Sequence, residues 1–118
     1  MSDYNSRRIS EAELTVLEVL WDLNAALPAK TIQDELKQRR GWERTTVRSL
    51  LTRLSEKGTV NVVKGEVAMY QAAFTREEYA WDLVEVLVDR MFNGKAEDLV
   101  RSLLQHKSLT AGDLAKLG

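Results

Sequence analysis

Residues 42–58 have the sequence WERTTVRSLLTRLSEKG, and their pattern predicts one helix with two unlike faces. Apolar side chains recur at steps of three and four residues, at Val47, Leu50, Leu51 and Leu54. The opposite side carries cations and hydroxyl groups, on Arg44, Thr45, Arg48, Ser49 and Thr52, with Thr46 and Arg53 on its flanks. We therefore expect a helix of about residues 44–57, closed by Gly58. One face would pack on a scaffold, and the other would offer hydrogen bonds and positive charge.

The positive charge of the chain is concentrated around this segment. The 118 residues carry 17 Lys and Arg against 18 Asp and Glu, which gives a net charge of -1. From Lys37 to Gly58, seven cations stand against two acids, a local charge of +5, and the rest of the chain carries -6. Binding to phosphate depends on the local field, so the near-neutral total does not argue against nucleic acid.

Composition excludes several other classes of protein. Cysteine is absent and His106 is the single histidine, so we expect no disulfide, no metal site and no cofactor. The sequence shows no phosphate loop, no Gly-rich dinucleotide turn and no nucleophile beside a base, so we expect no enzyme. No apolar run is long enough to cross a bilayer, and no signal peptide is visible. These features predict a cytoplasmic protein without membrane insertion.

The elements around residues 42–58 predict a winged helix-turn-helix. Ser10 with Glu13 has the spacing of a capping box, before a helix of about residues 11–23. Residues 24–27 form a connection, Pro28 suits the first turn of the next helix, and Gly41 suits its end. After Gly58, residues 59–64 and 67–73 predict a two-stranded hairpin with its turn at residues 65–66. The fold class is therefore mainly α with a small β-hairpin, and it includes a C-terminal helical region.

The C-terminal residues predict a dimerisation region. A second capping box, Thr75 with Glu78, begins a helix that residues 92–94 interrupt, and two further helical segments follow. This part is too small to build its own core, so a second copy of the chain is the expected partner. We expect three parts: a flexible arm (1–8), a DNA-binding domain (9–74) and a helical dimerisation domain (75–118). The expected dimer contacts are Trp81, Val84, Leu87, Val88, Met91, Leu99 and Leu103.

A basic helix in a winged helix-turn-helix indicates binding to DNA in the major groove. The expected contacts are Arg44, Thr45, Thr46, Arg48, Ser49, Thr52 and Arg53, with Lys64 on the wing. A dimer would present two such helices about 34–36 Å apart, matching the half-sites of a palindrome. Three alternatives stay open: an adaptor whose helix faces a protein, a solvated helix face, and a helix-end role for Arg39 and Arg40 in place of phosphate contact.

Several motifs resemble the BlaI/MecI/CopY family of bacterial penicillinase and copper-homeostasis repressors, over about residues 9–117. They are ISEAEL (9–14), VLW (19–21), Trp42, TVRSLLTRL (46–54), KG (57–58), FTREEY (74–79) and FNG (92–94). The resemblance implies a homodimeric repressor that occupies a dyad operator and blocks promoters. It also implies that Thr45, Thr46, Arg48, Ser49 and Arg53 contact the operator, with the closest match at Thr46 and Arg48.

Three features of the chain depart from the family pattern. Glu43-Arg44 stands where the family usually has Ser-Pro, so the helix lacks its usual cap and its operator preference is expected to differ. The cysteine cluster of the copper-responsive branch is absent. The β-lactam branch is induced through a membrane sensor and cleavage at an Asn-Phe bond, where this chain has Ser102-Leu103. An upstream sensor or protease is therefore left open.

Overall fold

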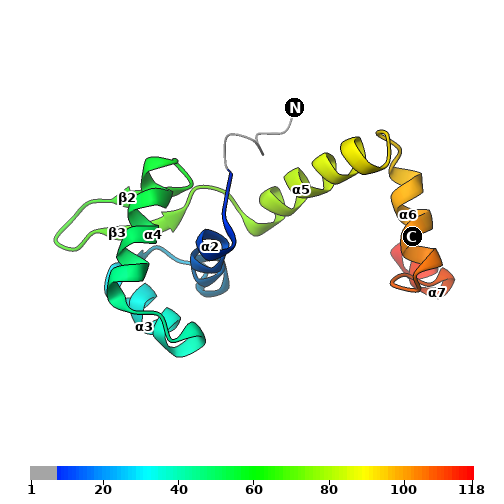
Figure 1. The fold of residues 1–118 in the computed structure, drawn as a ribbon. Helices are drawn as coiled ribbons and strands as arrows, with labels where there is room; N and C mark the ends of the chain where they lie inside the picture. The colour runs from blue at the N-terminus through cyan, green and yellow to red at the C-terminus, as the bar shows by residue number, and fades with distance from the viewer. Residues whose placement is uncertain (1–7) are drawn as a thin grey trace. The chain divides into compact units, whose positions relative to one another are not determined.

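The computed structural model describes residues 8–118, so residues 1–7 of the expected arm lie outside the described part of the chain. Contacts divide the described residues into two compact units, one that runs to Ala80 and one that starts at Trp81 (Figure 1). Helix α5 (Arg76–Met91) contributes residues to both units. None of the helices within residues 8–118 is long and apolar enough to cross a membrane.

The first unit is a winged helix, as the sequence predicts. Three helices, α2 (Glu11–Leu23), α3 (Ala29–Arg40) and α4 (Arg44–Glu56), are followed by strands β2 (Val60–Val63) and β3 (Met69–Ala72). The two strands pair antiparallel, and β2 packs against α4. The hairpin therefore follows directly on the helix that carries the basic face.

Local signals start and end these helices. The predicted capping box forms at α2, where the Ser10 hydroxyl accepts from the Glu13 backbone N–H (3.2 Å). In return, the Glu13 carboxylate accepts from the Ser10 N–H (2.8 Å). Gly41 ends α3 at a φ of 69°, in the left-handed region that side chains with a Cβ avoid. The turn from α3 to α4 is short because of this glycine.

The prediction for Pro28 and the sheet was wrong in one respect. Pro28 does not lie in the first turn of α3. It is extended (φ -71°, ψ 156°) and forms strand β1 (Leu27–Pro28), which pairs with Tyr70 and Met69. The sheet therefore has three strands in the order β1-β3-β2. The φ of proline fits an edge strand as well as a helix start, and a two-residue strand leaves no periodicity to detect.

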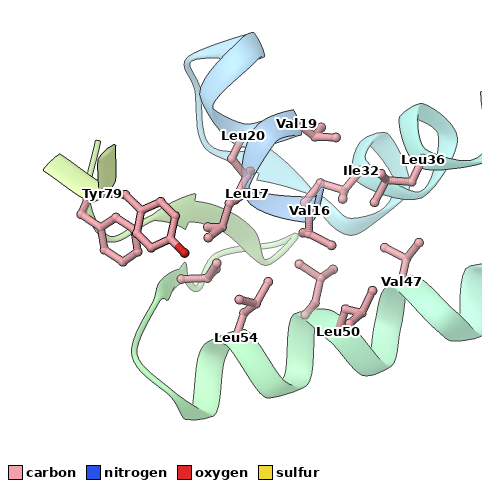
Figure 2. Packing of buried hydrophobic residues seen from close by; sticks show 13 residues of the cluster. Val16, Leu17, Val19, Leu20, Ile32, Leu36, Val47, Leu50, Leu54 and Tyr79 are labelled. Atoms are coloured by element: carbon pink, nitrogen blue, oxygen red, sulfur yellow. The ribbon is translucent and has the colours of Figure 1, made fainter. Parts of the chain in front are cut away.

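The core of the first unit lies between α2, α3 and α4. Figure 2 shows Val47, Leu50 and Leu54 of α4 with buried side chains of the other two helices. All four apolar residues predicted for the inner face of α4 are buried, at 0–3% exposure. The buried hydrophobic residues within residues 8–118 are Val16, Leu17, Val19, Leu20, Ile32, Leu36, Val47, Leu50, Leu51, Leu54, Val60, Phe74 and Tyr79.

Three aromatic residues close this core near the start of α5. The rings of Phe74 and Tyr79 stack with centroids 5.9 Å apart, and Trp21 lies about 6 Å from both. The Trp21 indole N–H donates to the Phe74 carbonyl (3.0 Å), and the Arg76 guanidinium lies 5.5 Å from the Trp21 ring. Phe74 and Tyr79 were not predicted as core residues, because their partners lie more than 50 positions earlier in the chain.

The second unit consists of the rest of α5, α6 (Ala96–Gln105) and α7 (Ala111–Leu117). The predicted interruption of the helix at residues 92–94 is confirmed. Asn93 and Gly94 take positive φ angles of 52° and 77° after α5 ends. Of residues 81–118, all of which the structure describes, none is buried. Large apolar side chains are exposed instead, with Trp81 at 61% and Met91 at 70%.

We predict that Trp21→Phe lowers the free energy of unfolding of the first unit by about 1 kcal/mol, the usual net value of one hydrogen bond. The phenyl ring keeps most of the packing but loses the N–H that binds Phe74. Urea denaturation followed by circular dichroism measures the change. The control is Trp42→Phe, since the half-buried Trp42 indole donates no hydrogen bond within residues 8–118. Equal losses for both variants would contradict the assigned role of the Trp21 bond.

Candidate nucleic-acid interface

Helix α4 presents every side chain predicted from its sequence to contact DNA. Burying one stripe of a helix forces the remaining positions outward, because the helix repeats every 3.6 residues. All seven of these side chains are exposed: Arg44, Thr45, Thr46, Arg48, Ser49, Thr52 and Arg53. Six of them fall into two rows of four-residue steps, one starting at Arg44 and one at Thr45. The outer face of α4 is defined here as these seven residues.

The arginines of the outer face of α4 have no carboxylate partner among the described residues. Within residues 8–118, Arg44, Arg48 and Arg53 form no ion pair. Of the hydroxyl groups, Thr52 donates to the Arg48 carbonyl (3.0 Å) and so offers only its lone pairs outward. The face therefore combines free guanidinium donors with the hydroxyl groups of Thr45, Thr46 and Ser49, which both donate and accept, and that of Thr52, which accepts.

The start of α4 leaves backbone donors free. Glu43 is the N-cap residue, and its side chain accepts no hydrogen bond from the helix, in agreement with the missing cap expected from the sequence. The first intrahelical bond runs from the Val47 N–H to the Glu43 carbonyl (3.2 Å). The N–H groups of residues 44–46 point out of the helix end, where they remain free to donate to an acceptor outside the helix.

Lys64 lies on the wing, in the five-residue loop between β2 and β3. It is exposed, and so is Glu66 in the same loop, so the wing carries no net charge. Val63 and Val67 beside them are 52% and 62% exposed. Lys64 is thus the one cation that this loop adds to the predicted interface, and it lies outside α4.

The neighbouring residues Arg39 and Arg40, near the end of α3, differ in their contacts. Arg39 donates to Asp22 (2.7 Å) and Glu35 (3.2 Å), and the Asp22 bond raises the pKa of Arg39. Arg76 also binds Asp22, and these two guanidinium groups lower the pKa of that carboxyl. Arg39 therefore ties α2 to α3, a role that the sequence pattern did not reveal. Arg40 is exposed and has no ion pair within the described residues.

The C-terminal end of α4 is fixed by a buried carboxylate. Lys57, the C-cap residue, donates to Glu13 of α2 (2.7 Å) and to the Arg8 carbonyl (2.8 Å). Glu13 is 0% exposed and its second oxygen has no partner in the described structure. Burial alone would raise the pKa of Glu13. The bonds from Lys57 and Ser10 outweigh burial, so the pKa lies below its ordinary value.

Other candidate features of the described residues are a metal site and the surroundings of His106, Ser102 and Leu103. Within residues 8–118, no three His, Asp or Glu side chains gather in a way that could hold a metal ion. His106 is exposed, and its ring Nδ1 lies 2.9 Å from the Ser102 carbonyl. Ser102 and Leu103 themselves lie within α6. The outer face of α4, with three arginines unpaired within the described residues and four hydroxyl side chains, is therefore the candidate site.

Comparison with known protein families covers nearly the whole chain. The family model described as penicillinase repressor matches residues 9–118. The chain is 27% identical to the penicillinase repressor of Bacillus licheniformis, over 93% of this chain and 86% of that protein. It is 23% identical to the methicillin resistance regulatory protein MecI of Mammaliicoccus sciuri, over 98% of this chain and 94% of that protein.

Solved structures match about two thirds of this chain. The solution structure of the DNA-binding domain of the repressor BlaI is 30% identical, with a TM-score of 0.56. The match covers 67% of this chain and 94% of that one. A solution structure of monomeric Bacillus licheniformis BlaI in complex with the blaP half-operator is also 30% identical, with a TM-score of 0.53. It covers 61% of this chain and 88% of that one.

We predict that Glu13→Gln destabilises the first unit by about 1–3 kcal/mol at pH 7, because Lys57 loses its charged partner. The folded-state pKa of Glu13 lies below its ordinary value of 4.5. Its stabilisation is therefore complete above that pH and is lost as the pH falls through the folded-state pKa. The difference between wild type and variant should shrink in acid, as urea denaturation at a series of pH values would measure.

The matched control for this variant is Glu11→Gln, two residues earlier on the same helix. Glu11 is exposed and forms no ion pair within residues 8–118, so its loss should change stability little at any pH. A difference between Glu13→Gln and wild type that stays constant down to pH 3 would contradict the role assigned to the carboxylate charge.

Proposed function

The chain belongs to the penicillinase repressor family, and we propose that two copies of it occupy a palindromic operator and block transcription, each with α4 in the major groove. The observation that carries the proposal is the outer face of α4. It holds three unpaired arginines and four hydroxyl side chains above a fully buried apolar stripe. An adaptor that binds protein through this helix would not need unpaired cations here.

Each side chain of the outer face is assigned a role from its chemistry and from the resemblance to the family, which is closest at Thr46 and Arg48. Arg48 and Thr46 contact base edges, where a guanidinium favours guanine and a hydroxyl adapts to several bases. The other residues of the outer face contact either bases or phosphates: Arg44, Thr45, Ser49, Thr52 and Arg53. Lys64 on the wing would bind phosphate oxygens and so help to fix the position of the helix on the duplex.

We assign dimerisation to residues 75–118. The lack of any buried residue among positions 81–118 supports this, because so many exposed apolar side chains are unfavourable in water without a covering partner. A second copy offers the same apolar side chains and so a self-complementary surface. The residues assigned to this contact are Trp81, Val84, Leu87, Val88, Met91, Leu99 and Leu103.

We predict that Arg48→Ala weakens operator binding by about 1–3 kcal/mol and relaxes the choice of base at one position of each half-site. Fluorescence anisotropy with operator and random duplexes over a range of salt concentrations measures both effects. An equal loss on the two duplexes would show that Arg48 contacts only phosphate. Binding by wild type to no duplex, even at low salt, would favour the adaptor.

The control for Arg48 is Lys30→Ala. Lys30 is an exposed cation on α3 that pairs with Asp34 at 3.6 Å. Its removal subtracts the same charge from the unit but leaves the outer face of α4 intact. We expect it to change neither operator affinity nor base preference, and a loss as large as that of Arg48→Ala would contradict the assignment to α4.

We predict that Leu103→Glu converts the dimer to a monomer, because it places a charge within the apolar surface of α6. Sedimentation equilibrium measures the mass. Affinity for the full operator should fall on the order of 100-fold, because a monomer cannot bind both half-sites at once. Affinity for a half-operator should stay unchanged. The control is Gln105→Glu, which adds the same charge at an exposed polar position of α6. A Leu103→Glu protein with the mass of two chains would contradict the assigned dimer contact.

A further inference from the structure

We propose that Glu43 selects a cytosine in each half-site by accepting a hydrogen bond from the cytosine N4 amino group. The inference rests on the proposed function, because it needs the start of α4 to lie in the major groove. It goes beyond that function by naming a base and a side chain that recognises it. Glu43 is not among the residues that the helix pattern predicts as DNA contacts.

The structure gives Glu43 no role inside the protein. Its backbone takes the extended conformation of an N-cap residue (φ -75°, ψ 157°), but its carboxylate caps no N–H group. The side chain is exposed and forms no ion pair within residues 8–118, although Arg44 follows it and Arg40 lies three residues before it. It is also the single acidic residue between Lys37 and Glu56.

An unpaired carboxylate is unfavourable at a surface that meets phosphates. It repels the DNA backbone whatever the sequence, so by itself it weakens binding to every duplex. The repulsion is offset only where the DNA supplies a hydrogen-bond donor within reach. The start of a helix placed in the major groove is the part that contacts base edges, which makes a base the donor available to Glu43.

The donors on base edges of the major groove narrow the choice to cytosine. Exocyclic amino groups are the donors there, on cytosine N4 and adenine N6. Beside the adenine amino group lies the N7 acceptor of the same base, which repels a carboxylate. Cytosine presents its amino group without an acceptor of its own in this groove. A carboxylate therefore favours cytosine, whereas an amide, which both donates and accepts, favours adenine.

The test compares base preference between wild type and Glu43→Gln. Duplexes with a randomised operator are selected on each full-length protein and sequenced, and single-base variants of the selected site are then measured by anisotropy. We expect wild type to prefer cytosine by about tenfold at one position of each half-site. In Glu43→Gln that preference should shift to adenine, while binding to random duplex becomes tighter because a negative charge is gone.

Glu56→Gln is the matched control for this test. Glu56 is exposed, forms no ion pair in the described structure and lies in the same helix. Thirteen residues separate it from Glu43, about 20 Å along the axis. Its replacement removes the same charge, so it should tighten binding to random duplex but leave every base preference unchanged.

The outcomes separate the inference from the proposed function. Identical base preferences in wild type and Glu43→Gln would overturn the role of Glu43 and leave the repressor function intact. A loss of the cytosine preference in Glu56→Gln as well would overturn it too, because charge alone would then be the cause. Wild type that selects no sequence at all would overturn the proposed function, and the inference with it. Circular dichroism of each variant confirms that it is folded.

Discussion

The burial of one apolar stripe of α4 is the constraint on which the proposed DNA-binding surface depends. Because Val47, Leu50, Leu51 and Leu54 are almost fully enclosed by the core, α4 is held against rotation about its axis. A rotation would expose several of these side chains and leave voids in a close-packed interior. The directions of the arginine and hydroxyl side chains are therefore set by the buried residues on the opposite side of the helix.

Polar contacts then fix the ends of the helices around this core. The Glu13–Lys57 pair joins the start of α2 to the end of α4, and Asp22 joins α2 to α3 and to the first turn of α5. Such pairs are directional, whereas apolar packing alone tolerates small shifts. The division of charge follows from this arrangement. Arg39, Lys57 and Arg76 are neutralised by carboxylates, whereas the arginines of the outer face of α4 have no ion pair within residues 8–118.

Much of this unit was predictable from local sequence signals. The bounds of α2 and α4, the glycine turns and the capping boxes, of which the second forms between Thr75 and Glu78, depend on residues within one or two turns of each other. The family resemblance was correct. Contacts between distant segments were not predictable. Strand β1, the core positions of Phe74 and Tyr79, and the pairing of Arg39 with Asp22 depend on segments that only the fold brings together. For the same reason, the count of cations from Lys37 to Gly58 overstated the free charge, because Arg39 and Lys57 are neutralised by partners from α2 and α3.

The absence of buried residues among positions 81–118 has a consequence for the response of a regulated gene. If a second copy covers these apolar side chains, the concentration of active repressor rises with the square of the chain concentration while most chains are still single. Modest changes in synthesis or degradation of the chain would then produce larger changes in promoter occupancy. The excess of exposed apolar side chains in this small unit would thus make repression respond steeply to the concentration of the chain.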